Sequence, residues 1–451
     1  MIRFGTDGIR GRFGDGITAE VAYAVGRAAA EVVADGGRLA LARDTRESGD
    51  ELARAVVAGA ASAAVEVVYL GVVPTPVLAS VTTRAGLPGC MITASHNPYF
   101  DNGLKLFNAA GLKLSADEER AVEGVVNGTV DALGDEPVDL GPDALGPVTV
   151  SADAGELVDG YLNDVVTPHA ELDLSTLRVG FDFAHGAGSH LGPRLFDRFK
   201  LGAVHYLGAE PDGRNINAGY GSTAPEAIMA AVTAEGLDLA FAFDGDGDRV
   251  LAIDERGRLV DGDTLIAILA GDLSDRGLLA DDTVVVTTWS NLGLHKAMAA
   301  RDIAVSQTEV GDKYILERLN ERSWSLGGEQ SGHIILRDRA TTGDGMLVAA
   351  ELLSVLARAV RPLGELADEA MQPLPQVATA VRVTTPPKEL VAQLADALAA
   401  QQAALGDDGR AVLRPSGTEP VVRVMAEALT VEGAQAVVDA LSAAVTERDA
   451  V

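Results

Sequence analysis

Short apolar segments that alternate with helical patterns are the feature that most constrains how this chain can fold. Apolar side chains recur at helical spacing over residues 18–37, where Thr18 is placed to cap the start, and a strand-like run at residues 39–42 follows. The order repeats with a helix over residues 52–64 and a strand over residues 65–70. Because strands separated by helices form parallel layers, this pattern predicts an α/β fold.

The same alternation continues along the chain. A segment that holds Pro74 and Pro76 is predicted to be broken by these prolines, and a strand at residues 89–92 comes after it. A helix is predicted over residues 191–200. The other apolar segments of this part lie at residues 177–183, 237–243, 250–253, 264–273 and 284–287.

After about residue 366 the pattern changes from α/β alternation to a small α+β pattern. Helices are predicted over residues 388–404 and 431–445. The predicted strands lie at residues 377–383, 411–414 and 421–427. This order favours an antiparallel sheet covered by helices.

Two places in the sequence indicate where the α/β part divides. A polar stretch rich in Gly, Asp and Pro over residues 127–147 has the composition of a linker, and one strand ends and another begins next to Arg249. The predicted domains are therefore residues 1–147, 148–249, 250–366 and 367–451.

Composition restricts the class of protein. The 451 residues are 47% hydrophobic, which is enough for several cores, and the formal charge is −30. Such an acidic chain lacks the basic surface that nucleic acid or an anionic membrane requires, so an anionic ligand must meet a local basic pocket. Cys90 is the only cysteine, which excludes an internal disulfide.

No long apolar segment is present in the sequence. The N-terminus lacks an apolar signal core, and the longest stretch of low charge, between Arg54 and Glu66, is shorter than the about 20 residues of a membrane helix. We therefore expect a cytoplasmic protein.

Ser95 follows the strand predicted at residues 89–92 and lies in the sequence TASHNP. A loop at the carboxyl end of a sheet strand is where open α/β folds bind ligands. A serine hydrolase of the α/β class needs a G-x-S-x-G turn, whereas Ala94 and His96 flank this serine. Phosphoryl acceptance at Ser95 remains open, as does an ordinary polar loop.

Three aspartates alternate with glycines directly after another predicted strand. Asp244, Asp246 and Asp248 can turn toward one hard cation, which favours Mg²⁺. The rival interpretation is an EF-hand calcium loop, because Glu255 stands at the twelfth position. Arg249 nevertheless occupies the sixth position, where that loop needs Gly, and strands rather than helices flank the motif.

Three further segments suit binding of a phosphorylated sugar. Residues 328–333, with the sequence GEQSGH, offer groups that hydrogen-bond sugar hydroxyls, although a polar loop is the plainer alternative. Residues 414–420, with Arg423 beyond them, place guanidinium groups and hydroxyls around a glycine, a set that can hold phosphate, although an ordinary hairpin loop is the alternative. Residues 4–11 space three glycines around Arg10 in a similar way.

Taken together and in this order, these five segments resemble those of the α-D-phosphohexomutase superfamily, over essentially the whole chain. The resemblance implies four domains around a central cleft: three α/β domains with mixed sheets and a C-terminal α+β domain. The sequences FGTDGIRG, TASHNP and GEQSGH are most similar to those of phosphoglucosamine mutases within the superfamily.

The resemblance also implies the catalytic residues. Ser95 is expected to carry a phosphoryl group in the active enzyme and to hold one Mg²⁺ ion together with the aspartates at positions 244, 246 and 248. Lys105 is expected to be the general acid/base, with its pKa lowered by neighbouring cations. The groups near the phosphoserine are Arg10, His96 and Arg249.

Three loops are implied to bind the phosphosugar. Their residues are Gly311, Asp312 and Lys313 in the first, Glu329, Ser331 and His333 in the second, and Arg414, Ser416, Gly417, Thr418 and Arg423 in the third. Lys313 departs from the family pattern, because an Arg is typical of glucosamine mutases at this position.

The implied reaction interconverts glucosamine 6-phosphate and glucosamine 1-phosphate and so feeds UDP-N-acetylglucosamine synthesis. Phospho-Ser95 gives its phosphoryl group to the sugar, and glucosamine 1,6-bisphosphate, also the activator, turns around and returns the other one. A phosphomannomutase/phosphoglucomutase of the same superfamily is the alternative. A phosphatase that uses Ser95 and a binding protein without turnover are more distant alternatives. The expected partner is a phosphosugar, with no nucleic acid and no membrane, and the choice between monomer and homodimer stays open.

Overall fold

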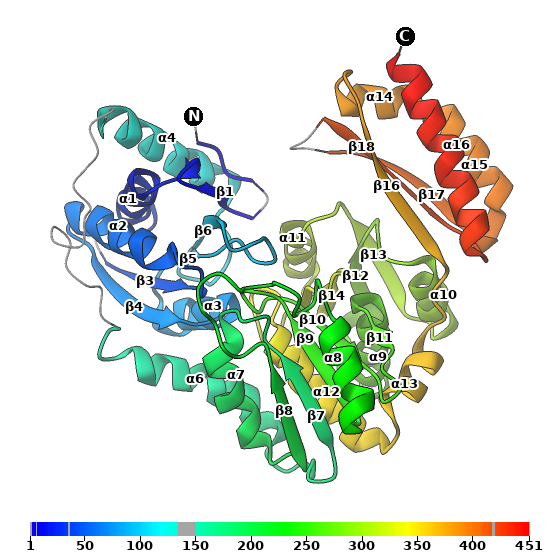
Figure 1. Ribbon diagram of the computed structural model, residues 1–451, viewed down its shortest axis with the longest axis horizontal. Helices are drawn as coiled ribbons and strands as arrows, with labels where there is room; N and C mark the ends of the chain where they lie inside the picture. The colour runs from blue at the N-terminus through cyan, green and yellow to red at the C-terminus, as the bar shows by residue number, and fades with distance from the viewer. Residues whose placement is uncertain (1, 6, 35–36, 134–149, 417–419, 451) are drawn as a thin grey trace. The chain divides into compact units, whose positions relative to one another are not determined.

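The computed structural model describes residues 2–5, 7–34, 37–133, 150–416 and 420–450. The chain forms two compact units. The first unit comprises Met1–Trp289 and Ala304–Ala367, and the second comprises Ser290–Ile303 and Asp368–Val451. Figure 1 shows the ribbon of each unit.

A mixed six-stranded sheet in the first unit carries the loop of Ser95. Its strand order is β2-β1-β6-β5-β3-β4, in which β3, β4 and β5 are parallel whereas β6 runs antiparallel to both β5 and β1. The hairpin of β5 and β6 therefore places residues 93–100 at one edge of the sheet. The strands are β1 (Ile9–Phe13), β2 (Gly16–Ile17), β3 (Arg38–Arg43), β4 (Glu66–Val72), β5 (Gly89–Ile92) and β6 (Asp101–Phe107).

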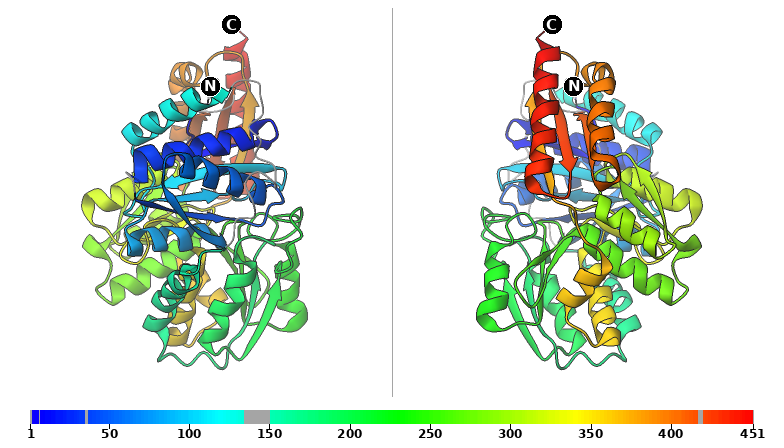
Figure 2. Two further views of the ribbon diagram at one scale, coloured as in Figure 1. Left: turned by 90° about the vertical axis from the view of Figure 1, so that its left-hand side faces the viewer. Right: turned by 90° about the vertical axis from the view of Figure 1, so that its right-hand side faces the viewer.

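Helices cover both faces of this sheet (Figures 1 and 2). The predicted cap is confirmed, because the Thr18 hydroxyl accepts a hydrogen bond from the Val21 amide at 3.3 Å. The helix that Thr18 caps, α1, is followed directly by a short π-helical segment, Ala29–Ala34. The α-helices are α1 (Ala19–Ala28), α2 (Gly49–Ser62), α3 (Thr75–Ala85) and α4 (Ala116–Leu133).

Two predictions about this region are wrong. The prolines do not break the segment after β4 but start α3, since Pro76 lies in the first turn, where a missing amide donor costs nothing. The linker predicted at residues 127–147 begins inside α4, which continues to Leu133 because Val122 and Val126 pack into the core. The rest of that linker, residues 134–147, lies outside the described residues.

The second sheet has the strand order β11-β10-β9-β7-β8. Strand β10 pairs antiparallel with β9, so the domain boundary predicted after Arg249 lies inside this sheet, and a cut after Val260 would keep the sheet whole. The strands are β7 (Arg178–Asp182), β8 (Ala203–Leu207), β9 (Leu239–Phe243), β10 (Val250–Ile253) and β11 (Leu259–Val260). Helices α7 (Gly188–Phe196) and α8 (Glu226–Glu235) pack on this sheet, whereas α6 (Ala154–Val166) packs against α3 and against β4 of the first sheet.

The third sheet of the first unit has the order β13-β12-β14-β15, with the last strand antiparallel to its neighbour. Its strands are β12 (Thr283–Thr287), β13 (Ala304–Thr308), β14 (Leu326–Gly328) and β15 (Ile334–Leu336). The associated helices are α9 (Gly262–Asp275), α11 (Asp312–Arg322), α12 (Gly345–Ala359) and α13 (Leu363–Ala370).

The second unit contains the predicted antiparallel sheet, with the order β16-β18-β17 and helices packed on it. The single helix predicted over residues 388–404 is wrong, because Leu394 leaves helical geometry and buries its side chain in the core. The elements are α10 (Leu292–Ala300), β16 (Gln376–Arg382), α14 (Pro387–Gln393), α15 (Ala395–Leu405), β17 (Arg410–Pro415), β18 (Val421–Glu427) and α16 (Val431–Asp449).

Within the described part of the chain, every helix is too short or too polar to cross a membrane.

The packing of α1 on α2 depends on Gly59. A Cβ atom there would overlap the carbonyl oxygen of Tyr23 and lie 2.8 Å from the amide nitrogen of Arg27, both on α1. We predict that Gly59→Ala lowers the free energy of unfolding by about 1–3 kcal/mol, because the two helix backbones must separate. The measurement is the melting temperature by calorimetry.

Gly124→Ala on α4 is the matched control, because a Cβ atom at Gly124 meets nothing within 4 Å. This change should stabilise the helix by roughly 0.5–1 kcal/mol. Equal melting temperatures for the two variants would contradict the close packing of α1 and α2.

Candidate active site

Ser95 lies in the β5–β6 loop with a left-handed backbone, at φ +50°. Its side chain is almost completely buried and donates a hydrogen bond to Asp244 Oδ2 at 2.6 Å. The amide of Ser95 donates to the hydroxyl of Thr93 at 2.9 Å, and His96 Nδ1 lies 3.4 Å from Ser95 Oγ. The strained backbone turns the hydroxyl toward the aspartates, which is common where function fixes a conformation.

Arg46 fixes the conformation of this loop through hydrogen bonds to its backbone. The Arg46 guanidinium is fully buried and donates hydrogen bonds to four main-chain carbonyl oxygens, three in the loop and one at the first residue of β6, with three of the four at 2.9–3.0 Å. Because one rigid, planar group satisfies four acceptors, the loop has few alternative conformations. The four carbonyl oxygens belong to Ser95, Asn97, Pro98 and Asp101.

Two more polar side chains complete this support. Asp44 Oδ2 accepts from Arg46 Nε at 2.8 Å and from the Thr93 hydroxyl at 2.7 Å, so the buried guanidinium has a counter-charge. Asn217, from the second sheet's loops, donates its amide to two of the same loop carbonyl oxygens, at 2.9 and 3.1 Å.

Arg46, Asp44 and Asn217 are not part of any motif that the sequence predicted to be functional. Asp44 and Arg46 directly follow the strand predicted at residues 39–42, at the same sheet edge as Ser95, and this position was the signal that could have found them. Asn217 had no such signal, because it comes from a loop more than 100 residues away.

The three aspartates predicted as metal ligands do meet in one place. One carboxylate oxygen from each of Asp244, Asp246 and Asp248 lies within 4.8 Å of the others, and all three residues are buried. Oδ1 of Asp246 and Oδ1 of Asp248 are buried without a hydrogen-bond partner. Buried, unpartnered carboxylate oxygens are what a hard cation such as Mg²⁺ requires, so this triad fits a metal site.

The neighbouring α3 helps to orient the triad. The hydroxyl of Thr75, the first residue of α3, donates to Asp246 Oδ2 at 2.6 Å, and the amide of Thr75 donates to the carbonyl oxygen of Asp246 at 2.9 Å. The helix thus fixes both the side chain and the backbone of the central aspartate.

The electrostatics of the triad are uneven. Burial, with Asp248 and Asp246 close by, raises the pKa of Asp244 well above its usual value. Burial alone would also raise the pKa of Asp248, but Lys105 and His333 hold it well below the usual value. The repulsion between the carboxylates therefore raises the pKa mainly of Asp244, the aspartate that accepts the hydrogen bond from Ser95 Oγ.

The surroundings of Lys105 differ from those that its predicted pKa required. Its Nζ atom is buried and lies 2.9 Å from Asp246 Oδ2, 3.0 Å from Asp7 Oδ2 and 3.5 Å from Asp248 Oδ2. Burial alone would lower the pKa of Lys105, but these carboxylates raise it above the ordinary value. The expected lowering by neighbouring cations is therefore wrong for the groups that this structure contains, because acids dominate the surroundings.

The other residues predicted near the phosphoserine lie around it. Burial, together with Arg249 and Arg10, lowers the pKa of His96 to about 4, so the imidazole is neutral at pH 7. The Arg249 amide donates to Asp244 Oδ1 at 3.2 Å, and the Arg10 guanidinium pairs with Asp7.

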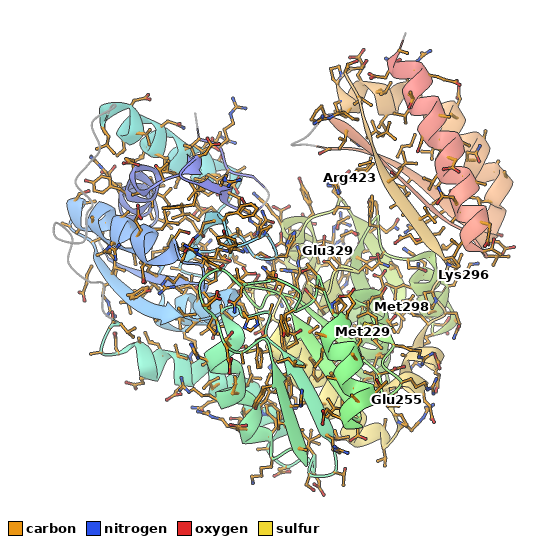
Figure 3. The ribbon with its side chains drawn as sticks, viewed as in Figure 1. Met229, Glu255, Lys296, Met298, Glu329 and Arg423 are labelled. Carbon is orange, nitrogen blue, oxygen red and sulfur yellow. The ribbon has the colours of Figure 1, made fainter. Side chains whose placement is uncertain are left out.

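The two predicted sugar loops of the first unit contact each other. Glu329, on the loop after β14 (Figure 3), accepts a hydrogen bond from the amide of Gly311 at 3.1 Å, and the Ser331 hydroxyl lies 3.3 Å from a Glu329 oxygen. The Lys313 ammonium lies 3.1 Å from Glu119 at the start of α4.

His333 joins these loops to the aspartates. Its Nε2 atom accepts a hydrogen bond from the Gly343 amide at 3.1 Å, which leaves the ring proton on Nδ1 toward Asp248 Oδ2, 3.7 Å away. Asp312 Oδ2 lies 3.7 Å from His333 Nε2.

The predicted phosphate loop lies in the second unit. Arg414 on β17 stands directly opposite Arg423 on β18, and the amide of Ser416 donates to the carbonyl oxygen of Val421 at 3.0 Å. The β-pairing thus brings two arginines together at the start of the loop. Gly417 and Thr418 lie outside the described residues.

Comparison with known families places all four parts of the chain. Residues 1–131 match phosphoglucomutase/phosphomannomutase alpha/beta/alpha domain I, and residues 159–257 match domain II. Residues 261–374 match domain III, and residues 379–444 match the C-terminal domain.

Individual relatives cover nearly the full length. The phosphoglucosamine mutase of Pelotomaculum thermopropionicum is 46% identical over 433 residues, which span 94% of this chain and 95% of the relative. That of Geobacillus thermodenitrificans is 43% identical over 444 residues, 97% of each chain.

Solved structures agree on the fold. A phosphoglucomutase/phosphomannomutase family protein from Burkholderia thailandensis, 25% identical, has a TM-score of 0.78 and covers 98% of this chain and 97% of its own. Aspergillus fumigatus N-acetylphosphoglucosamine mutase, solved with GlcNAc-6P and magnesium, is 19% identical, with a TM-score of 0.68 over 100% and 96% of the two chains. The chain therefore belongs to the phosphoglucomutase/phosphomannomutase family of the α-D-phosphohexomutase superfamily.

Proposed function

We propose that the chain is a phosphoglucosamine mutase, an isomerase that interconverts glucosamine 6-phosphate and glucosamine 1-phosphate through a phosphorylated Ser95. The observation that carries this proposal is the buried Ser95 hydroxyl, 2.6 Å from the acidic triad and held by a loop that Arg46 fixes. The choice of glucosamine phosphate is supported by relatives 42–46% identical that are phosphoglucosamine mutases.

The chemistry is the transfer of one phosphoryl group in each direction. The bond from phosphorus to Ser95 Oγ breaks as a bond to a sugar hydroxyl oxygen forms, and the proton of that hydroxyl passes to Ser95 Oγ, which gives glucosamine 1,6-bisphosphate and a free serine hydroxyl. After the sugar turns around, the bond from the other phosphorus to its sugar oxygen breaks as Ser95 Oγ takes that phosphoryl group, and the serine proton passes to the sugar oxygen that phosphorus leaves. When bound by the triad, Mg²⁺ neutralises charge on the phosphoryl group.

Lys105 is placed to move the proton in this exchange. Its Nζ atom lies 2.9 Å from Asp246 Oδ2, next to the triad and therefore close to any phosphoryl group on Ser95. Lys105 would relay this proton, giving one to the oxygen that phosphorus leaves and taking one from the oxygen that phosphorus joins. The carboxylates around Lys105 would attract its ammonium less strongly when they also hold a cation, which would ease this transfer. His96, neutral at pH 7, accepts or donates hydrogen bonds beside Ser95 Oγ.

We assign sugar binding to the two loops that contact each other at Glu329. Glu329, Ser331 and His333 bind ring hydroxyls, and Gly311, Asp312 and Lys313 border the sugar. Binding of the phosphate that does not react belongs to Arg414, Ser416, Gly417, Thr418 and Arg423.

The proposed function also includes an activator, a metal ion, a cellular location and a division into domains. Glucosamine 1,6-bisphosphate is both intermediate and activator, one Mg²⁺ ion binds per chain, and the protein acts in the cytoplasm. The chain divides into four domains near the predicted boundaries, with the second boundary moved beyond β11 so that its sheet stays whole.

Substrate preference tests the proposed function. We predict that kcat/KM for glucosamine 6-phosphate exceeds that for mannose 6-phosphate and glucose 6-phosphate by about 10-fold or more, which is ~1.4 kcal/mol of transition-state binding. The assay uses the Ser95-phosphorylated chain, Mg²⁺ and each sugar's 1,6-bisphosphate. Equal or faster turnover of the neutral hexoses would instead assign a phosphomannomutase/phosphoglucomutase, with Lys313 as the first residue to exchange for Arg.

Removal of one aspartate tests the metal site. Titration calorimetry with MgCl₂ should give one site per chain, and Asp246→Asn should weaken binding by about 10-fold or more, because a charged ligand is lost. Asp338→Asn serves as control, since the Asp338 side chain is 60% exposed and lies outside the triad. If Asp246→Asn and the control bind Mg²⁺ equally well, the triad is not the metal site.

A further inference from the structure

We propose that Lys113 is a positioning residue for the mutase reaction: its ammonium ties the acid/base Lys105 to the sugar loop through Asp7 and Asp312. This inference rests on the proposed function and adds a residue that neither the motifs nor the metal site indicated.

The two contacts of Lys113 are short and link distant parts of the chain. Its Nζ atom lies 2.6 Å from Asp7 Oδ1 and 2.6 Å from Asp312 Oδ2. Asp7 belongs to the N-terminal segment and Asp312 begins α11, so one ammonium joins segments about 300 residues apart in sequence. The side chains involved are mostly buried, with exposures of 14% for Lys113, 24% for Asp7 and 17% for Asp312.

Asp7 connects Lys113 to Lys105, because it contacts both ammonium groups. While one carboxylate oxygen of Asp7 faces Lys113, the other lies 3.0 Å from Lys105 Nζ. Burial alone would raise the pKa of Asp7, but Lys105, Lys113 and Arg10 hold it well below the usual value, so the carboxylate is charged at neutral pH. Asp7 therefore orients both ammonium groups at once.

Asp312 connects Lys113 to the sugar loop, because it contacts Lys113, the Lys313 amide and His333. Its second oxygen accepts a hydrogen bond from the amide of Lys313 at 2.9 Å, and the first lies 3.7 Å from His333 Nε2. The adjacent Lys313 reaches across to Glu119 at 3.1 Å, so two neighbouring ion pairs hold the start of α11 against the segment that follows β6.

The backbone places Lys113 next to Lys105. Phe107, the last residue of β6, forms an antiparallel bridge with Lys113, and the turn between them closes through the hydrogen bond from the Asn108 amide to the Leu112 carbonyl oxygen at 2.8 Å. Gly111 adopts φ +72° in this turn, a conformation that favours glycine. A tight turn thus presents a second lysine to the same aspartate.

Loss of the ammonium leaves two partly buried carboxylates without their shared counter-charge. Asp7 would then keep Lys105 and Arg10 as its cationic partners, and Asp312 would keep the His333 ring 3.7 Å away, so both Lys105 and the sugar loop would shift. A misplacement of about 1 Å at reacting groups costs up to ~100-fold in rate.

The test compares Lys113→Met with Lys113→Arg and a control in the assay for glucosamine 6-phosphate. We expect Lys113→Met to lower kcat by about 10- to 100-fold while its melting temperature stays within a few degrees of the wild type. Lys113→Arg should recover most of the loss, because a guanidinium can bridge the same two carboxylates. The control is Lys296→Met, which removes an ammonium on α10 (Figure 3) that is 47% exposed.

A double-mutant cycle with Asp312→Asn shows whether Lys113 acts through Asp312. The account predicts that the double variant is about as slow as the slower single variant, whereas independent effects would multiply. Unchanged kcat in Lys113→Met, no recovery in Lys113→Arg or multiplied effects would each overturn the inference. A wild-type chain without mutase activity would overturn the proposed function first, and the inference with it.

Discussion

The hydrogen bonds from Arg46 to the loop of Ser95 are the interaction on which the candidate site depends. A β5–β6 hairpin alone would leave that loop free to choose among several conformations, and its serine adopts φ +50°, which an isolated chain rarely favours. Arg46 satisfies four carbonyl oxygens in and next to the loop and has Asp44 as its counter-charge. The loop is therefore fixed before any ligand binds, and the serine hydroxyl points at Asp244 without further ordering cost.

Half of the lysines of the chain lie at the candidate site, each next to acidic side chains. The chain carries a formal charge of −30 and only six lysines, yet Lys105, Lys113 and Lys313 all lie in or beside this site. Between them stand Asp246, Asp7, Asp312 and Glu119, so positive and negative groups alternate from the aspartate triad to the loop that is predicted to bind the sugar. A buried charge is costly unless it is paired, and each of these three lysines is paired with at least one carboxylate.

The sequence predicted the parts of this arrangement that depend on local patterns. The cap at Thr18, the alternation of strands and helices and the clustering of three aspartates after one strand all follow from neighbouring residues. The two prolines at the start of α3 and the helix break at Leu394 were misjudged, because position within a turn and burial decided them.

The rest of the site was beyond local patterns. Arg46, Asn217 and Lys113 act on groups 49 to more than 100 residues away, and no spacing in the sequence indicates such contacts. The pKa of Lys105 was predicted in the wrong direction for the same reason, since Asp7 and Asp246 come from remote segments.

The most direct test is to locate the phosphoryl group. Phosphatase-treated chain is incubated with glucosamine 1,6-bisphosphate and Mg²⁺, and the digested protein is examined by mass spectrometry. The account predicts one phosphoryl group per chain, on the peptide that contains Ser95 and attached to that serine. A phosphoryl group on another side chain, or none on Ser95 in a chain that catalyses the mutase reaction, would contradict the account.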